Sequence, residues 1–246
     1  MDFITADQLN KTYGVGDSTV MAIADVSFRI ESGEFVAVMG ESGAGKSTLL
    51  SIMGAMNTPT SGAYLVDGID VYDLGQEQRA DFRREFLGFI FQSFHLVPYL
   101  NVIENVMLPL TTIRMARRKK EAMAMQALSW VGIDTKAKRL PTQISGGEKE
   151  RVAITRAIVN DPPILLADEP TGNLDSRNTQ EVMELLQRLN EGGTTVIMVT
   201  HSAECAGYAR RLLEISDGRL ISTGLVKSLE SKHKKAPAVR ATVRAA

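Results

Sequence analysis

A glycine-rich segment at residues 40–48 has the residue types of a phosphate-binding loop. It runs Gly-Glu-Ser-Gly-Ala-Gly-Lys-Ser-Thr and fits the pattern G-x-x-x-x-G-K-[ST]. Glycines let the backbone turn so that successive N–H groups point at phosphate oxygens, and a helix starting there adds positive partial charge. In such loops the lysine, here Lys46, reaches the β- and γ-phosphates, and the hydroxyl of Ser47 holds Mg²⁺. The predicted nucleotide contacts are Gly40, Ser42, Gly43, Ala44, Gly45, Lys46, Ser47 and Thr48.

Two acidic residues, Asp168 and Glu169, follow four apolar residues that are typical of a buried strand. Ligands of open α/β sheets bind at the carboxyl edge of the strands, where these side chains are expected. We predict that Asp168 helps to place Mg²⁺, whereas strand alternation turns Glu169 elsewhere, so that it polarises the attacking water. The alternative is a pair of carboxylates that face solvent. His201 follows the apolar stretch 195–200 in the same way, although a lone histidine is more often structural than catalytic.

Strand and helix signals alternate along the chain, which is typical of a mostly parallel α/β sheet. Residues 26–30 alternate as in a half-exposed antiparallel strand, and residues 35–39 are continuously apolar, as in a strand covered on both faces. A helix is expected from Lys46 to about Ala55. Further strands are expected at 63–66, 87–92, 164–167 and 195–200.

The middle of the chain, about 94–160, has a mostly helical pattern, which we interpret as a helical subdomain inserted into the sheet domain. Within it Trp130 is expected in the core. Basic residues cluster at 114–120 and are interpreted as a solvated helix start, with lipid headgroup contact as the alternative. The apolar residues after Gln92, at 94–99, either pack this subdomain onto the core or border a groove for a partner helix.

The composition fits a globular domain of 246 residues, since 44% are hydrophobic and 23% are charged. A formal net charge of −1 argues against a general nucleic-acid binder, whose surface would be strongly basic. The first residues lack the pattern of a signal peptide, and no segment approaches 18 uncharged apolar residues, so any membrane function is expected to need another chain. Residues 227–246 are basic and rich in alanine. They are expected to form a disordered tail, with adhesion to an anionic membrane as the alternative.

A second short string, Ile-Ser-Gly-Gly-Glu at residues 144–148, resembles the signature motif of ATP-binding cassette (ABC) ATPases. The phosphate loop, Gln92, this string, the acidic pair, Asp175 and His201 occur in the order and spacing of that family, over nearly the whole chain. The resemblance implies a P-loop NTPase over residues 1–226, with a RecA-like, mostly parallel α/β core, an antiparallel β subdomain and the inserted helical subdomain. Position 148 is Glu where the family often has Gln, and position 144 is Ile where Leu is usual. Neither change removes the backbone donors of the Ser-Gly-Gly sequence.

The resemblance also implies roles for individual residues. Tyr13 looks like the aromatic residue that stacks on adenine, and His201 like the residue that contacts the γ-phosphate. Gln92 looks like the glutamine that touches Mg²⁺ and the attacking water and links the site to the helical subdomain. The residues expected to face the nucleotide bound by a second copy of the chain are Ser145, Gly146 and Gly147. Asp175 looks like the aspartate that crosses the dimer interface next to the nucleotide. The signature residues are expected to open a helix from about 148 to 159.

The implied cofactors are ATP and Mg²⁺, and the implied assembly is a homodimer with two sandwiched nucleotides. The strings at 91–98, 102–109 and 167–175 are similar to one clade of bacterial ABC ATPases, which includes the MacB macrolide exporter, the LolD lipoprotein-release ATPase and the FtsE division ATPase. The expected partner is a separately encoded integral membrane permease, through which a periplasmic adaptor can be reached. The expected location is the cytoplasmic face of the bacterial inner membrane.

Three functions are compatible with an ABC-type ATPase. The first is an energy-coupling subunit that hydrolyses ATP to power the permease. The second is an FtsE-like regulatory ATPase that signals to cell-envelope machinery without transport, and the sequence leaves this alternative open. The third, a DNA-repair type of ABC ATPase, is disfavoured because a long coiled coil would separate its phosphate loop from its signature, whereas about a hundred residues without heptads lie between them here.

Overall fold

The central sheet of the computed structural model, which describes residues 2–14 and 18–226, has the strand order β10-β9-β3-β8-β7-β6. Its strands are β3 (Phe35–Met39), β6 (Leu87–Ile90), β7 (Ile164–Asp168), β8 (Thr195–Val199), β9 (Arg211–Ser216) and β10 (Arg219–Leu225). Neighbouring strands are parallel from β9 to β6, and β10 pairs antiparallel with β9. The predicted tail, residues 227–246, lies outside the described residues.

Alternate side chains of the central strands enter two different cores. On β3, Phe35 and Ala37 belong to the core on the helical side, whereas Val36 and Val38 belong to the core shared with the second sheet. Strands β7 and β8 divide their side chains in the same way. Because both faces of the sheet are covered, these strands carry continuous apolar runs, as the sequence predicted.

The second sheet is antiparallel, in the order β2-β1-β4-β5. Its strands are β1 (Asp2–Tyr13), β2 (Val20–Glu31), β4 (Ser61–Val66) and β5 (Ile69–Asp70). The helix α1 (Lys46–Met53) contacts β2 on one side and β7 and β8 on the other, so it fills the space between the two sheets. The parallel core and this antiparallel sheet confirm the predicted fold class.

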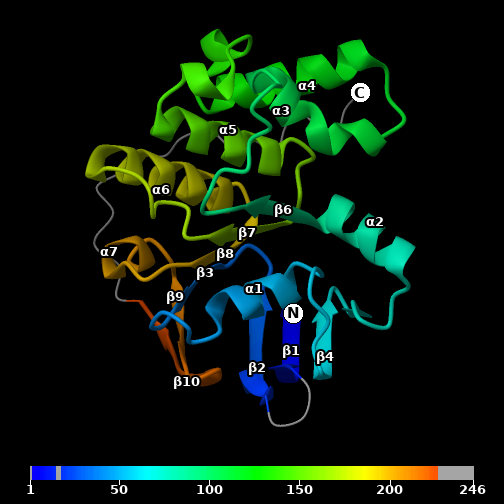
Figure 1. Ribbon diagram of the computed structural model, residues 1–246, viewed down its shortest axis with the longest axis vertical. Helices are drawn as coiled ribbons and strands as arrows, with labels where there is room; N and C mark the ends of the chain where they lie inside the picture. Colours follow the sequence, from blue (N-terminus) through cyan, green and yellow to red (C-terminus); the bar gives the residue numbers. More distant parts are fainter. Residues whose placement is uncertain (1, 15–17, 227–246) are drawn as a thin grey trace.

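Helices between β6 and β7 form a layer on the opposite face of the central sheet (Figure 1). Its elements are α3 (Val102–Met107), α4 (Arg117–Trp130), α5 (Gly146–Ile158) and the 3₁₀ turns η2 (Leu108–Thr112), η3 (Asp134–Lys136) and η4 (Pro141–Gln143). The remaining helices are α2 (Gln76–Phe86), α6 (Ser176–Glu191) and α7 (Ala203–Ala206). Among residues 2–14 and 18–226, no helix has both the length and the apolar composition to cross a bilayer.

Some boundaries differ from the sequence-based expectations for local reasons. The helix expected to reach Ala55 ends at Met53, and Ala55 adopts a left-handed backbone with φ 52°. Strand β6 ends at Ile90, so Gln92 lies in the following turn rather than at the strand end. Trp130 packs at the edge of the core rather than inside it, with the Arg188 guanidinium 4.7 Å from its ring centroid.

A carboxyl group is buried in α5. Glu150 is 1% exposed, and its Oε1 atom has no hydrogen-bond partner among the described residues. Burial raises the pKa of Glu150 to about 8, and the positive charge of Arg156 offsets part of the rise. The folded protein therefore holds this proton more tightly than the unfolded chain, in which the pKa of the same carboxyl has its ordinary value of 4.5.

The variant Glu150→Gln should be more stable than the parent by an amount that grows between pH 4.5 and about 8. Below pH 4.5 both states are protonated. As the pH rises above that value, the unfolded chain ionises first, so the parent loses about 1.4 kcal/mol per pH unit until the folded carboxyl also ionises. Denaturant unfolding at pH 5.5 and pH 8.5 measures this difference. A gain that is equal at the two pH values would contradict the buried, proton-binding carboxyl.

Candidate active site

The phosphate loop follows β3 directly, and its shape requires glycine at defined positions. Gly43 and Gly45 have left-handed backbones with φ 82° and 100°. A Cβ atom on Gly45 would lie 2.3 Å from the carbonyl oxygen of Ala22, and one on Gly40 would lie 2.1 Å from that of Ile215. The loop thus passes against both sheets at a distance that side chains would prevent.

Lys46 extends back into this loop. Its Nζ atom donates hydrogen bonds to the carbonyl oxygens of Gly40, at 2.8 Å, and Glu41, at 2.7 Å. The residue is only 7% exposed, so its positive charge is partly removed from water. An ammonium group has three donors, and one remains for a phosphate oxygen after these two bonds.

Ser47 and Asp168 bring oxygen atoms together beside the loop. The hydroxyl of Ser47 donates to Oδ1 of Asp168 at 3.4 Å. Burial, and after it the charge of Glu169, raises the pKa of Asp168, while the Ser47 hydroxyl and the Lys46 charge offset part of that rise. A hydroxyl and a carboxylate are hard oxygen ligands of the kind that Mg²⁺ prefers, so this pair fits the predicted metal.

The three predicted catalytic side chains converge next to this pair. Oε1 of Glu169 lies 3.1 Å from Nδ1 of His201, and Oε2 accepts a hydrogen bond of 3.3 Å from Nε2 of Gln92. The prediction that strand alternation directs the Glu169 side chain is wrong. Strand β7 ends at Asp168, and a left-handed backbone with φ 46° at Glu169, rather than strand alternation, directs this side chain. The result is a carboxylate with a polar partner on each oxygen.

Tyr13 lies at the end of β1 and is 43% exposed. Its hydroxyl accepts a hydrogen bond from the side chain of Asn57, which follows α1, and Nζ of Lys11 lies 5.0 Å from the ring centroid. Part of the ring is therefore open to solvent, as an adenine-stacking residue needs. Its contact with a base stays a prediction.

The signature residues form the first turn of α5, two residues earlier than expected. Ser145 is the N-cap and accepts a hydrogen bond from the backbone N–H of Glu148, while the Glu148 carboxylate accepts one of 2.7 Å from the N–H of Ser145. This reciprocal cap explains why Glu fits at a position where the family often has Gln. A Cβ atom on Gly147 would lie 2.0 Å from Oδ1 of Asn178, so this turn packs directly on α6.

Asp175 caps α6 in the same region. Its carboxylate accepts hydrogen bonds from the backbone N–H of Asn178, at 2.9 Å, and from the Asn178 side chain, at 2.7 Å. These bonds hold the pKa of Asp175 below its ordinary value. Asn178 thus links Asp175 to the signature turn.

The structure brings the loop residues, the acidic pair, Gln92 and His201 to one edge of the central sheet. It does not place the signature turn there, because α1 and α5 belong to different cores on opposite faces of that sheet (Figure 1). Sequence reasoning missed two contributing residues. Asn178 could have been found from its place three residues after a capping aspartate. Asn173, which donates to the carbonyl oxygen of Gln92 at 3.0 Å, gave no signal of its own.

A phosphate loop after one buried strand, with a carboxylate pair at the end of a second parallel strand of the same sheet, defines a P-loop nucleoside triphosphatase. The chain belongs to the ABC transporter family, whose sequence pattern matches residues 23–172. Its fold is that of an ABC-type ATPase.

Individual relatives are consistent with this assignment. The uncharacterized ABC transporter ATP-binding protein MJ1508 of Methanocaldococcus jannaschii is 43% identical over 218 residues, which are 89% of this chain and 97% of that protein. The macrolide export ATP-binding/permease protein MacB of Syntrophobacter fumaroxidans is 43% identical over 242 residues, 97% of this chain. The chain spans 34% of the length of that MacB protein.

Among solved structures, the dimeric ATP-binding cassette MJ0796 bound to ADP and phosphate is similar. Its TM-score is 0.84 at 38% identity, over 92% of this chain and 99% of that one. CbiO1 of Clostridium perfringens, described as part of the transporter complex CbiONQ, has a TM-score of 0.82 at 28% identity.

Proposed function

We propose that this protein binds MgATP, hydrolyses it to ADP and phosphate, and uses the energy to drive a separately encoded membrane permease. The observation that carries the proposal is the Glu169 carboxylate, which His201 and Gln92 hold beside the Ser47–Asp168 pair. The description of the similar MJ0796 cassette as a post-hydrolysis state with ADP and phosphate supports it.

In the proposed reaction Lys46 binds the β- and γ-phosphates and offsets their charge. Ser47 and Asp168 would hold Mg²⁺, with Gln92 as the further predicted ligand, and the ion would supply positive charge to the phosphates. Glu169 accepts a proton from a water molecule while the oxygen of that water bonds to the γ-phosphorus. At the same time the bond between the γ-phosphorus and the leaving oxygen of ADP breaks. The hydrogen bond from Gln92 and the close contact with Nδ1 of His201 hold this carboxylate in place, and His201 also contacts the γ-phosphate.

The proposed assembly is a head-to-tail homodimer with two nucleotides. The central sheet separates the phosphate loop from the signature turn of the same chain, so one copy can offer only one of them to a given nucleotide. A two-fold axis would let each copy supply the other, with Ser145, Gly146 and Gly147 facing the partner's γ-phosphate. Descriptions of the MJ0796 cassette as dimeric support this arrangement.

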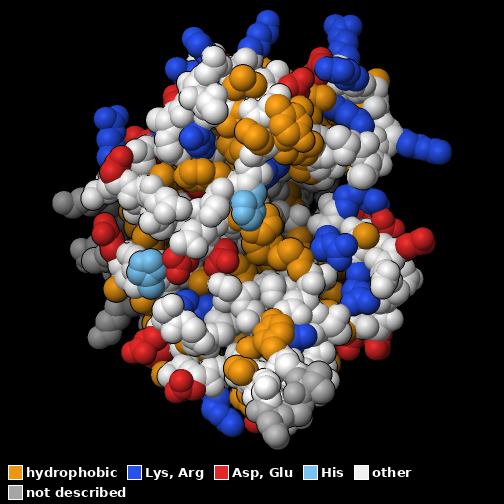
Figure 2. Space-filling model, in the orientation of Figure 1, with side chains coloured by type: hydrophobic (Ala, Val, Ile, Leu, Met, Phe, Trp, Pro, Cys, Tyr) orange, Lys and Arg blue, Asp and Glu red, His pale blue; other side chains and the backbone are white. Residues whose placement is uncertain are grey.

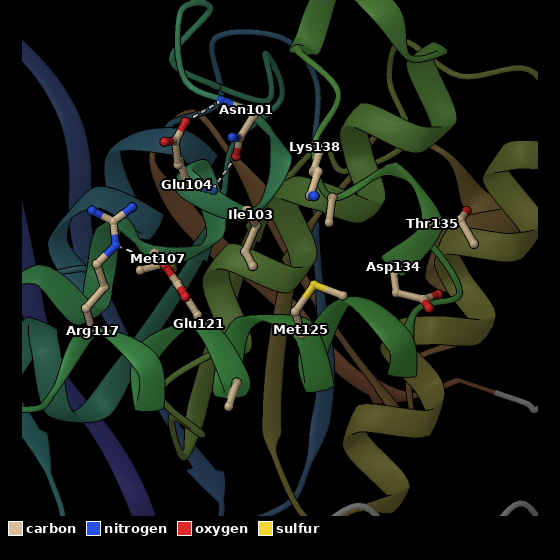
Figure 3. A pocket seen from close by; sticks show the side chains of 12 residues that line it. Asn101, Ile103, Glu104, Met107, Arg117, Glu121, Met125, Asp134, Thr135 and Lys138 are labelled. Carbon is tan, nitrogen blue, oxygen red and sulfur yellow. Dashed lines mark hydrogen bonds and ion pairs between the residues drawn. The ribbon is translucent and has the colours of Figure 1, made fainter.

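A groove between α3 and α4 is the proposed docking place for a short helix of the permease (Figure 3). It has a volume of about 730 Å³ and a largely apolar floor that includes Ile103, Met107 and Met125. Glu104 and Lys138 lie on its polar rim. Flexible methionine side chains adapt to an apolar helix, and rim charges can select its orientation. On the face drawn in Figure 2, hydrophobic side chains gather over the helical layer, with basic side chains around them.

The loop at 94–99, which the sequence placed beside a partner groove, supplies none of the residues that line this groove. Two residues of the loop differ in their environment. Leu96 packs on the helical-side core, so a charge there would disturb folding. Tyr99 is 80% exposed and remains a candidate contact. Through such a partner the protein would lie at the cytoplasmic face of the inner membrane, and a periplasmic adaptor would be reached only through the permease. The relatives named as ATP-binding/permease proteins and CbiO1 in its complex support a permease partner.

Lys46→Ala should weaken MgATP binding at least about a hundredfold, because hydrogen bonds to charged groups contribute about 1.5–3 kcal/mol each and the lysine faces several phosphate oxygens. Titration with a fluorescent ATP analogue measures the affinity. The matched control is Lys120→Ala on α4, which should bind as the parent does. Undiminished affinity in Lys46→Ala would overturn the proposed site.

Met125→Glu should separate ATP hydrolysis from permease coupling. The charge would lie in the apolar floor of the groove. A bound partner helix would then bury this charge without a hydrogen-bond or ion-pair partner. Co-purification with the permease and permease-stimulated turnover should fall at least about tenfold, whereas basal hydrolysis should survive. Met56→Glu, at another exposed methionine outside the groove, is the control. Normal binding and stimulation in Met125→Glu would place the permease contact elsewhere.

A further inference from the structure

The turn after Gln92 has an unfavourable backbone shape. Phe94 and His95 are consecutive residues in the left-handed region, with φ 56° and 47°. Such a conformation is unfavourable for a residue with a side chain, because the Cβ atom comes too close to the following carbonyl oxygen. It persists only where the surroundings hold it in place.

Arg156 of α5 holds this turn. Its Nη1 atom donates to the carbonyl oxygen of His95 at 2.5 Å, and its Nη2 atom donates to that of Phe94 at 2.7 Å. The planar guanidinium fork matches two adjacent carbonyls, which a lysine cannot do. Burial lowers the pKa of Arg156, and the Glu150 carboxyl partly offsets this. The side chain is thus a charged donor pair in a partly desolvated place, where its hydrogen bonds are strong.

The chain on both sides of this turn is also fixed. Before it, the carbonyl oxygen of Gln92 accepts a hydrogen bond from Asn173, and its side chain donates to Glu169. After it, the fully buried side chain of Asn105 bonds to both the N–H and the carbonyl of Val97. A shift of α5 would pull on the carbonyls at 94 and 95 and would act, against the hydrogen bonds that hold Gln92, on this nearest functional side chain.

We propose that Arg156 is a positioning residue that makes the placement of Gln92 depend on the position of α5. The inference rests on the proposed function, in which the first turn of α5 faces the nucleotide held by the partner copy. Arg156 lies about three turns further along the same helix. Occupancy of the partner's site thereby sets the position of Gln92 in this chain's own site.

A double-mutant cycle tests the inference, with kcat for ATP hydrolysis measured in the parent, Arg156→Lys, Gln92→Ala and the combined variant. Arg156→Lys keeps the charge but loses the fork, and it should lower kcat about ten- to a hundredfold through a misplaced Gln92. In the Gln92→Ala background the same change should lower kcat less than about twofold, because its target is already absent. Hydrogen exchange at residues 93–97 should become faster in Arg156→Lys.

The control is Arg151→Lys on the same helix, where the arginine bonds to Val131 and Glu181 instead of the turn. Its effect should multiply with that of Gln92→Ala, as a general disturbance of α5 would. If Arg156→Lys does not fold, Phe94→Gly is the second variant, because glycine makes the turn itself more flexible without a change in α5. Its effect on kcat should likewise be smaller in the Gln92→Ala background than in the parent.

Multiplicative effects of Arg156→Lys, or of Phe94→Gly, with Gln92→Ala would overturn the inference. In that case the parent would still hydrolyse ATP and the proposed function would stand. A parent protein that does not hydrolyse ATP would overturn both.

Discussion

The register of three adjacent parallel strands, β3, β8 and β7, is the constraint on which the site depends. Val199 on β8 lies opposite Val38 on β3 and opposite Asp168 on β7, so these strands end at the same height. The backbone N–H of Glu169 bonds to the carbonyl of Val199 at 3.0 Å, which carries the alignment one residue beyond the strand. The phosphate loop, the acidic pair and His201 consequently leave the sheet at one edge. A slip of one residue would exchange the two cores and move each of these side chains to the wrong face.

The helix α5 provides the second organising element. Its first turn presents the signature residues and packs Gly147 on Asn178, which also holds Asp175. Further along, Arg151 bonds to the end of α4 and to α6, and Arg156 bonds to the turn after Gln92. One helix thus touches the parts of the molecule that face the partner copy in the proposed dimer and the turn beside the chain's own candidate site. This geometry gives a physical route by which events at one nucleotide can affect the other.

Much of this arrangement could be predicted from the sequence, and the exceptions have physical causes. The continuous apolar runs of β3, β7 and β8 identified the buried strands, because such runs occur where both faces are covered. Fixed-spacing motifs placed Lys46 and the acidic pair in one region. In contrast, α2 carries no clear sequence signal, because its only buried residue is Phe82. The left-handed backbone that directs Glu169 has no sequence signal either. The hydrogen bonds of Arg156 join residues about sixty positions apart and follow only from the packed fold, since no local pattern encodes them.

In the proposed assembly, two copies of the chain enclose ATP between the phosphate loop of one and the signature turn of the other. The most direct test is the solution mass of Glu169→Gln with MgATP, measured by light scattering after size exclusion. This variant should retain ATP because it lacks the base that activates water, and binding of ATP to the closed form should accumulate the dimer. The expected result is twice the monomer mass with MgATP and the monomer mass with ADP or when Lys46→Ala is added. A protein that holds MgATP and yet remains a monomer at high concentration would contradict the shared sites.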